Sequence, residues 1–397
     1  MKALYLDWNA YAGEYVKKAI ENYGHELVLF DFPASDAPKN NEEVSTKIAT
    51  KIITEKIDYV FSLNYFPVAA IACKACGVKY ISWTYDSPYV LLYSDTINFE
   101  TNYAFIFDRA EVMNLKSLGV STVYYMPMAA PARVYTEMTA AVNTQKAPTV
   151  RNRDFTADIA MIGSMYTEKK HRLMEKFAGA SDYTRGYLEA LVESQKFLYG
   201  TDIIEPALSA RVMTELMEKA PMLMPEDEFK KPEWVYSKYF LLREVTRRER
   251  HECLDLISQH VKTTLYTHEP TPDLPRVDNR GPVDYYNEMP LAMKGAKINL
   301  NISLRSIVSG IPLRAWDIFG AGGFLLTNYQ ADFTDFFTPG EDYVYFENPE
   351  DLAEKAEYYL SHESERMGIA MAGHEKVMKL HTYDARFSEI MLTVFGE

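Results

Sequence analysis

The amino-acid sequence predicts an α/β protein with two doubly wound domains in series. The chain has 397 residues, more than one hydrophobic core usually serves. In both halves, short apolar runs rich in β-branched and aromatic residues alternate with amphipathic stretches of helical length. Such alternation is typical of a parallel sheet with helices on both faces. The two alternations are separated by a segment that lacks this rhythm.

The first alternation occupies residues 1–135. Its strands are expected at 2–7, 26–32, 58–63, 78–83, 102–107 and 121–127. The amphipathic stretches between them predict helices at 13–24, 41–56, 67–77 and 109–119. Gly24 closes the first helix, where glycine is a common terminating residue. Together these elements predict one doubly wound domain.

Residues 136–155 are expected to form a linker, because this segment gains Pro, Thr, Asn and Arg as the alternation stops. The second alternation runs from 156 to 382. Its strands are expected at 156–164, 261–267, 296–303, 323–328 and 342–346, and its helices at 167–179, 284–295, 312–322 and 348–362. Between about 184 and 260 the pattern is helical without a strand, which predicts a helical insert in the second domain.

The composition disfavours several classes of protein. The net charge of −14 disfavours nucleic acid as a partner, because such binding depends on Lys and Arg neutralising phosphates. No apolar run reaches the roughly 18 residues that predict a transmembrane helix. The N-terminal stretch MKALYLDWNAYAGEY becomes polar too early for a signal peptide, and the three cysteines form no disulfide framework. We therefore expect a cytoplasmic protein.

The sequence lacks the motifs of metal-dependent and serine hydrolases. Its eight histidines are scattered without an H-E-x-x-H spacing, and it contains neither a G-x-S-x-G elbow nor a D-x-D motif. We therefore expect no metal site and no cofactor.

Candidate binding residues follow the strands of the second domain. In doubly wound sheets, ligands bind outside the carboxyl ends of the strands, where the strand order reverses. Gly163, Ser164 and Tyr166 follow the first strand of this domain, Arg305 follows the third, and Asn328 ends the fourth. We expect these residues to border one ligand site.

The stretch PLRAWDIFGAGGFLLTN supplies further candidates. Arg314 lies near the start of an expected helix, and Asp317 lies one turn further on the same face. Arg305 and Arg314, with the helix N-terminus, would hold a diphosphate, and Asp317 would accept hydrogen bonds from ribose hydroxyls. Gly322 and Gly323 would let the backbone approach a ligand closely. Two alternatives stay open: the arginines could pair with Asp317, and the glycines could only end the helix.

In the first domain, the stretch WTYDSP directly follows a strand. From this position Asp86 would face a cleft between the domains, although its side chain could instead only initiate a turn. Gly13, Asn64, Tyr65 and Tyr85 also lie after strands and would border the same space. The tyrosines there could stack on a sugar or a base.

Taken in order, several stretches resemble glycosyltransferases of the GT-B fold. AKINLNISLRS…GIPLRAWDIFGAGGFLLTN and the closing HTYDARF resemble the C-terminal domain of these enzymes, and the most similar branch is the spore-maturation CgeB-like family. IGSMYTEKKHRLM is similar to the first strand of that branch's donor domain, and WTYDSP and FIFDRAEVMNLKSLGVSTVYYMPMAA resemble its acceptor-side domain. The resemblance covers nearly the whole chain and is densest over 283–386.

This resemblance implies two Rossmann-like domains that face each other across a cleft. Residues 1–135 would form the acceptor side, and the C-terminal helix at about 383–397 would cross back onto them. Residues 156–382 would hold the donor nucleotide. The acceptor would be a cell-surface, spore or protein-linked glycan.

The resemblance also implies roles for individual residues. Asp317 matches the second acidic residue of the family's E-x7-E pattern, which holds the ribose. Ser309 stands at the first acidic position, so this half of the pattern is missing. Arg305 and Arg314 would clamp the phosphates, and Gly322 and Gly323 would provide the close backbone approach.

The implied activity is transfer of a sugar from a nucleoside-diphosphate sugar, with a UDP-sugar as the expected donor. Positive groups aimed at the leaving phosphate would stabilise its developing charge, so Arg305 and Arg314 are candidate catalytic residues and a metal is not required. The resemblance favours a retaining reaction, whereas an inverting one would need a base, for which Asp86 is the candidate. The alternatives are a nucleotide-sugar epimerase or hydrolase on the same fold, and a non-catalytic nucleotide- or sugar-binding protein, which Ser309 favours.

Overall fold

The structure is a computed structural model that describes residues 1–34, 41–143, 153–168, 173–222 and 231–396. The chain forms two compact units. The first contains Met1–Ala129 and the C-terminal segment from His381, and the second contains the described residues between Ala130 and Leu380. Each unit is built on a six-stranded parallel sheet with flanking helices, so the predicted α/β fold class is confirmed.

The sheet of the first unit has the strand order β2-β1-β3-β4-β5-β6. Its strands are β1 (Lys2–Asp7), β2 (Glu26–Asp31), β3 (Tyr59–Leu63), β4 (Lys79–Thr84), β5 (Asn102–Ile106) and β6 (Val123–Tyr125). Each overlaps a strand that the apolar runs predict. Because β1 pairs with both β2 and β3, the strand order reverses between β1 and β3.

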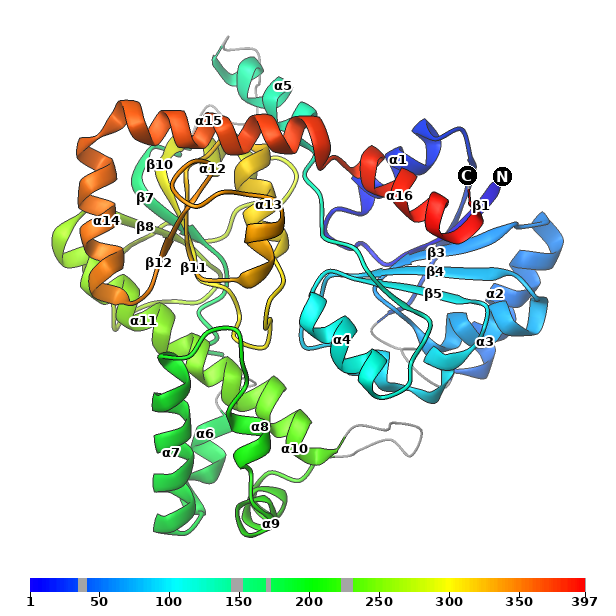
Figure 1. Ribbon diagram of the computed structural model, residues 1–397, viewed down its shortest axis with the longest axis horizontal. Helices are drawn as coiled ribbons and strands as arrows, with labels where there is room; N and C mark the ends of the chain where they lie inside the picture. Colours follow the sequence, from blue (N-terminus) through cyan, green and yellow to red (C-terminus); the bar gives the residue numbers. More distant parts are fainter. Residues whose placement is uncertain (35–40, 144–152, 169–172, 223–230, 397) are drawn as a thin grey trace. The chain divides into compact units, whose positions relative to one another are not determined.

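Helices cover both faces of this sheet, as the fully buried strand β3 requires. The helices are α1 (Gly13–Asn22), α2 (Glu42–Glu55), α3 (Pro67–Cys76), α4 (Arg109–Ser117) and α16 (Tyr383–Phe395), with short 3₁₀ turns at Val90–Tyr93 and Asp95–Asn98. Figure 1 shows α1 and α16 on one face and α2, α3 and α4 on the other.

Helix α16 completes the hydrophobic core of the first unit. The ring centroid of Phe387 lies 6.2 Å from that of Phe61, and the ring centroid of Phe395 lies 5.7 Å from that of Tyr59. At the end of the helix, Lys79 Nζ donates a hydrogen bond to the carbonyl oxygen of Val394 at 2.5 Å. The first unit therefore draws on both ends of the sequence.

The sheet of the second unit has the order β12-β11-β10-β7-β8-β9. Its strands are β7 (Ala157–Ile162), β8 (Thr263–Tyr266), β9 (Asp278–Asn279), β10 (Ala296–Asn301), β11 (Leu325–Asn328) and β12 (Val344–Phe346). Strand β7 pairs with both β8 and β10, so the order of this sheet reverses between β7 and β10.

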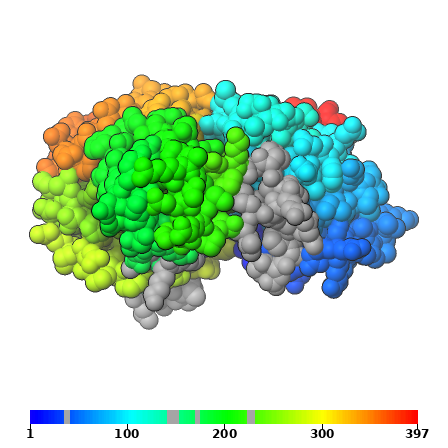
Figure 2. Space-filling model, turned by 90° about the horizontal axis from the view of Figure 1, so that it is seen from below, coloured from blue at the N-terminus to red at the C-terminus, as the bar shows by residue number. Residues whose placement is uncertain are grey.

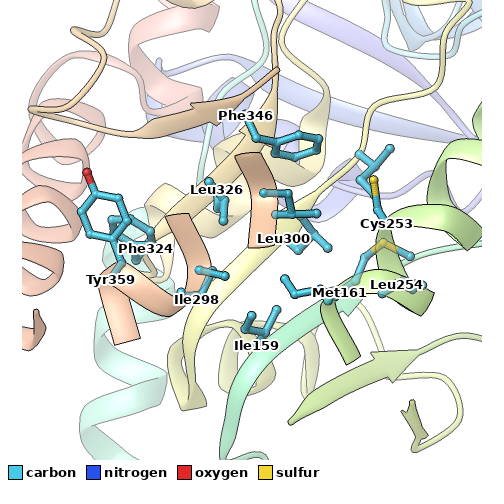
Figure 3. Close-up of a cluster of buried hydrophobic side chains, with 14 of the residues drawn as sticks. Ile159, Met161, Cys253, Leu254, Ile298, Leu300, Phe324, Leu326, Phe346 and Tyr359 are labelled. Atoms are coloured by element: carbon cyan, nitrogen blue, oxygen red, sulfur yellow. The ribbon is translucent and has the colours of Figure 1, made fainter. Parts of the chain in front are cut away.

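Helices α5 (Ala132–Asn143), α12 (Met289–Gly295) and α13 (Leu313–Gly320) pack on one face of this sheet, and α11 (Leu242–His260) and α14 (Pro349–Ser361) pack on the other. Helix α15 (Glu363–Leu380) follows α14. Figure 3 shows the core between the sheet and α11 and α14, with Ile159, Met161, Ile298, Leu300 and Leu326 from the strands against Cys253, Leu254 and Tyr359 from the helices.

A helical insert lies between β7 and β8, as the sequence predicts. It contains α6 (Leu173–Lys176), α7 (Asp182–Lys196), α8 (Ile204–Ala207), α9 (Ala210–Lys219), α10 (Pro232–Val235) and a π-helical turn at Tyr236–Leu241 that continues into α11. The insert has a core of its own, which includes Leu188, Val212, Leu216, Tyr236 and Leu242. Figure 2 shows its outer surface in green.

The structure differs from the sequence expectations in several elements. Helix α5 occupies the first part of the segment assigned to a linker, and neither α15 nor the short strand β9 has a counterpart among the expected elements. Within the helix expected at 167–179, the described residues form α6 and a 3₁₀ turn at Phe177–Gly179, and residues 169–172 lie outside the described part of the chain. No helix in the described part of the chain combines the length and apolar character needed to cross a bilayer.

Candidate functional site

The reversal of strand order between β7 and β10 brings two loops together at the carboxyl edge of the second sheet. The loop after β7 starts with Gly163 and Ser164, and the loop after β10 starts with Ile302 and Ser303. A crevice at such a reversal is the common ligand site of doubly wound sheets. The residues that border it decide what it can bind.

Arg314 lies directly against the loop after β7. Gly163 has a φ of +147°, and a Cβ atom at this position would lie only 2.6 Å from Nη2 of Arg314. The same guanidinium donates from Nη1 to Oδ1 of Asn301 at 3.2 Å, which fixes it beside the end of β10. Only glycine allows both this backbone conformation and this close approach. The structure thus places Gly163 and Arg314 in direct contact, and their role in ligand binding stays a prediction.

Arg250 of α11 connects the loops after β7 and β10 through hydrogen bonds. Its guanidinium is 1% exposed and donates to the carbonyl oxygens of Ser164 and Ile302, the latter from Nε at 3.1 Å. It also lies 5.0 Å from the ring centroid of Tyr166, and the guanidinium of Arg243 lies 5.5 Å from the same centroid. Three arginines therefore gather around the loop after β7.

The positive charge of this cluster persists at neutral pH. Desolvation and the neighbouring Arg250 lower the pKa of Arg314 to about 10, which still leaves its guanidinium protonated. Arginine forks bind phosphate oxygens in a bidentate manner. A crevice with this charge suits a phosphate group.

Glu269 holds the loop after β7 in place from the opposite side. Its carboxylate accepts hydrogen bonds from Oγ of Ser164, from Oγ1 of Thr267 and, at 3.0 Å, from the backbone N of Met165. Desolvation opposes ionisation, but the hydrogen bonds from Ser164 and Thr267 outweigh it and lower the pKa of Glu269 to about 2. The loop backbone is therefore held by an ionised carboxylate.

A network of amides continues from Arg314 to the end of β11. Nδ2 of Asn301 donates to Oγ of Ser303 at 3.1 Å and to Oγ1 of Thr327 at 2.9 Å, and Oδ1 of Asn328 accepts from the backbone N of Ser303 at 2.9 Å. Asn328 is fully buried. It supports the loop after β10 and lies behind the crevice rather than in it.

Asp317 lies one turn beyond Arg314 on α13, but it is buried rather than open to a ligand. Its side chain is 1% exposed, and Oδ1 accepts hydrogen bonds from the hydroxyls of Tyr135 at 3.0 Å and Tyr285 at 3.4 Å. Desolvation raises its pKa to about 7. Arg314 and Asp317 are not among the ion pairs of the described residues; the guanidinium turns towards Gly163 instead. In this structure the carboxylate contacts two tyrosines, and its contact with a ribose stays a prediction.

The raised pKa of Asp317 predicts a pH dependence of stability. Between its ordinary value of 3.8 and about 7, the folded state keeps a proton that the unfolded state releases. The free energy of unfolding should therefore fall as pH rises through this window. Asp317→Asn, which cannot ionise, should flatten this part of the profile, as measured by chemical unfolding at a series of pH values. An unchanged slope in the variant would contradict the assignment.

The structure also corrects the role of Gly322 and Gly323. Both lie at the C-terminal end of α13, before β11 begins, and so at the opposite edge of the sheet from the crevice. A Cβ at Gly322 would lie 3.1 Å from Nζ of Lys294, and one at Gly323 would lie 2.5 Å from Nδ2 of Asn299. These glycines end the helix and allow close packing, which is the second of the two readings that the sequence leaves open.

Arg305 is directed away from the crevice. Its Nε donates to Oε2 of Glu249 at 2.7 Å, its Nη2 donates to the carbonyl oxygen of Lys196 at 2.7 Å, and its guanidinium stacks 3.6 Å from the ring centroid of Tyr199. The side chains of Arg305 and Glu249 are 4% and 5% exposed. Arg305 thus anchors the helical insert to the loop after β10, and these contacts engage the guanidinium that the sequence analysis assigns to a phosphate.

The first unit has a pocket at its own reversal of strand order, with a volume of about 610 Å³. Asp86 and Asn64 lie on its wall, and Nδ2 of Asn64 donates to Oδ2 of Asp86 at 2.7 Å. Oδ1 of Asn64 accepts from the backbone N of Tyr85 and Asp86 at 3.2 and 3.4 Å. Desolvation by the surrounding protein raises the pKa of Asp86, although the side chain is open to the pocket. The structure thus brings Asp86 and Asn64 together.

The other residues expected beside Asp86 differ in position. Gly13 begins α1 and is buried, and a Cβ there would lie 3.2 Å from the hydroxyl of Tyr5. Tyr85 is half-buried and its ring stacks on Trp8. Tyr65 is fully buried, and its hydroxyl bonds to Oγ1 of Thr96 at 2.8 Å. Tyr65 is therefore a core residue rather than a ligand contact.

Comparison with known proteins shows which solved structures share this fold. Residues 239–392 match a family model described as glycosyl transferase-like. The structure is similar to that of Anabaena Alr3699/HepE in complex with UDP and glucose, with a TM-score of 0.58, 11% identity and 100% of both chains covered. It is also similar to sucrose-phosphate synthase from Thermosynechococcus elongatus, with a TM-score of 0.54, 8% identity, and 100% of this chain and 99% of that chain covered. The fold is that of GT-B glycosyltransferases.

The GT-B fold is shared by proteins with other named activities. The UDP-GlcNAc 2-epimerase from Neisseria meningitidis bound to UDP-GlcNAc is similar with a TM-score of 0.51 and 11% identity, over 99% of this chain and 100% of that chain. No curated protein matches the sequence. The fold alone therefore leaves the reaction to be argued from the residues of the crevice.

Several residues of this GT-B crevice escape sequence reasoning. Arg243 and Arg250 are seven residues apart on one helix, a spacing that puts them on one face, and this is the signal that could have found them. Glu269 follows β8 by three residues, and in the separate pocket of the first unit Trp8 directly follows β1. Both obey the rule that ligand-site residues follow strands, but nothing in the sequence separates them from other polar and aromatic residues at strand ends.

Proposed function

We propose that this protein is a glycosyltransferase that transfers a sugar from a UDP-sugar to a carbohydrate acceptor. The observation that carries the proposal is the gathering of three arginines around the loop after β7, at the reversal of strand order in the second sheet: Arg314 lies against Gly163, and Arg250 and Arg243 lie against Tyr166. The match to a glycosyl transferase-like family model and the similarity to a fold solved with UDP and glucose support it. Membership of the narrower CgeB-like family and a cytoplasmic location belong to the same proposal.

In this proposal the second unit binds the donor. The diphosphate lies against the backbone of the loop after β7, where Gly163 leaves room, and Arg314 contacts its oxygens. As the bond between the sugar and the diphosphate breaks, negative charge develops on the leaving oxygen. Preorganised positive groups stabilise that charge, and a fixed guanidinium needs little reorganisation to do so. Arginines of the chain supply this charge in a reaction that we propose proceeds without a metal.

The first unit, which includes the helix α16, binds the acceptor. Asp86 accepts a hydrogen bond from the acceptor hydroxyl and Asn64 orients the carboxylate. We propose retention of configuration, in which the enzyme supplies no covalent nucleophile. In an inverting reaction, Asp86 would instead remove the hydroxyl proton as the general base.

Calorimetric titration with UDP, GDP, ADP, CMP and dTDP tests the donor site. We expect saturable binding of UDP without added metal, and weaker binding or none for the others. Absence of binding for all five nucleotides, also with magnesium or manganese, would reject the proposal in favour of a non-catalytic protein. Turnover of UDP-sugar that needs no acceptor would instead indicate an epimerase or a hydrolase.

Gly163→Ala tests the close approach of Arg314 to the loop. The new methyl group would collide with Nη2 of Arg314 and strain the backbone, so we expect UDP affinity to fall at least about tenfold and stability to fall by about 1–3 kcal/mol. Gly200→Ala is the matched control, because Gly200 also has a positive φ of +73° but nothing within 4 Å of its Cβ position. It should lose stability and keep its UDP affinity. Equal UDP affinities for wild type and Gly163→Ala would contradict the site.

A further inference from the structure

The pocket of the first unit is lined by residues that directly follow four neighbouring strands. Trp8 and Asn9 follow β1, Phe32 follows β2, Asn64 and Phe66 follow β3, and Asp86, Tyr89 and Leu91 follow β4. Its volume of about 610 Å³ lies within the ~300–1,000 Å³ that small-molecule sites occupy. The pocket therefore has the position and the size of a ligand site within the first unit alone.

Aromatic residues are prominent in the lining of this pocket, and Trp8 and Tyr89 are the half-buried ones. The centroid of the buried Phe66 ring lies 4.5 Å from that of Phe32 and 6.2 Å, edge to face, from that of Trp8, so these buried rings support Trp8 from behind. The indole Nε1 of Trp8 donates to the carbonyl oxygen of Leu63 at 2.8 Å, and the hydroxyl of Tyr89 donates to the carbonyl oxygen of Tyr65 at 2.9 Å. These bonds fix both rings in orientation, and they engage the polar atoms with the backbone.

The polar side of the pocket is a single carboxylate with a fixed orientation. Asn64 donates to Oδ2 of Asp86 and is itself held by the backbone N of Tyr85 and Asp86. Oδ1 of Asp86 accepts no hydrogen bond from the described residues. Among the described residues that line the pocket, Asp86 carries the only charge. The described lining of the pocket thus offers a strong hydrogen-bond acceptor and no cation.

These features select the chemistry of the ligand. A sugar ring has an apolar face of C–H groups that can pack on aromatic rings, and hydroxyl groups that can donate to a carboxylate. A phosphate or carboxylate group on the ligand would be repelled by Asp86 and would meet no positive partner among the described residues that line the pocket. We infer that the pocket binds a neutral saccharide, which stacks on Trp8 and donates a hydroxyl hydrogen to Asp86. As an account of the acceptor, this inference rests on the proposed function.

Tryptophan fluorescence gives a direct test that needs no donor and no turnover. Of the four tryptophans, Trp83, Trp234 and Trp316 are fully buried, whereas Trp8 is half-buried and lines the pocket. We expect methyl hexosides and neutral disaccharides to change the fluorescence of the full chain in a saturable manner. Glucose 6-phosphate and glucuronate should bind at least about tenfold more weakly, since the charged oxygen of Asp86 opposes them. Trp8→Phe, which keeps an aromatic ring, should remove the signal.

Two variants decide whether the response comes from this pocket. Asp86→Asn should weaken binding of the neutral saccharides about tenfold, because a hydrogen bond to a charged acceptor is lost. Phe197→Ala is the control, because Phe197 is 77% exposed on the helical insert and lies outside the pocket. It should bind as wild type does.

Failure of this inference is distinct from failure of the proposed function. Absence of any fluorescence response to neutral saccharides up to high millimolar concentration would overturn the inference, as would equal binding of the anionic sugars or an unchanged affinity in Asp86→Asn. UDP binding to the second unit, measured separately by calorimetry, would stand in each of these cases. Conversely, saccharide binding without UDP binding would keep the pocket assignment and reject the transferase.

Discussion

Arg314→Ala is expected to lower kcat/KM for sugar transfer by about 10²–10³, because it removes a preorganised positive group from the leaving diphosphate. It should also weaken UDP binding in calorimetric titration. The guanidinium lies against Gly163 and, among the described residues, donates one hydrogen bond to a side chain, that of Asn301, so its loss opens the crevice without removing a large part of the core. The thermal transition should therefore stay close to that of the wild-type protein.

Two further variants sharpen this test. Arg314→Lys keeps the charge but loses the bidentate fork, so its rate should lie between those of the wild-type protein and Arg314→Ala. Arg276→Ala removes an arginine of the same unit that is 57% exposed, and it should leave UDP binding and transfer unchanged. Wild-type UDP affinity and activity in Arg314→Ala would remove this residue from the site.

Arg305→Ala is expected to have the largest effect on stability. The substitution leaves the carboxyl group of Glu249 buried without its arginine partner, and breaking such a pair costs about 3–5 kcal/mol. It also removes the stacking on Tyr199 and the hydrogen bond to the carbonyl oxygen of Lys196. Urea unfolding followed by circular dichroism should show this loss in the second unit, where the insert meets the sheet.

The matched control for Arg305 is Arg247, which pairs with Glu244 but whose side chain is 31% exposed. Arg247→Ala should cost about 0–1 kcal/mol, as exposed ion pairs do. The double variant Arg305→Met with Glu249→Leu should recover much of the loss, because no unpaired charge stays in the interior. If Arg305→Ala instead unfolds like the wild-type protein and loses UDP binding, then the phosphate role expected from the sequence would be restored.

The strands and the long helices are predictable because their signals are local. The five residues of β3 are apolar or small and sit between turn residues, and α13 is bounded by Pro312 and the Gly322–Gly323 pair. Helix α15 is not predictable in this way, because its apolar residues follow no clear helical stripe and its burial depends on neighbours distant in sequence. Helix α5 lies in a segment whose polar composition is typical of a linker.

The site is predictable only in outline, because many of its contacts join residues that are distant in the sequence. Strand ends identify Gly163 and Asp86, because the rule that links them to a ligand depends on the sheet alone. Which arginine enters the crevice depends on tertiary packing: Arg305 follows β10 as the rule requires, yet Glu249 of the insert draws it away. Arg250 lies inside a helix and reaches the loops only because α11 packs beneath them. Likewise, the burial of Asp317 depends on Tyr135, which is distant in the sequence.

The position of α16 has a consequence for how the protein is made on the ribosome. This helix follows the entire second unit in the chain, yet its Phe387 and Phe395 cover Phe61 and Tyr59 of the first unit. Domains generally fold as they are synthesised, from the N-terminus onwards. Here one face of the first sheet must wait for α16 while more than 250 further residues are translated. During that interval this apolar face is a natural binding site for chaperones, and the last step of folding is the docking of a single helix onto a sheet made long before it.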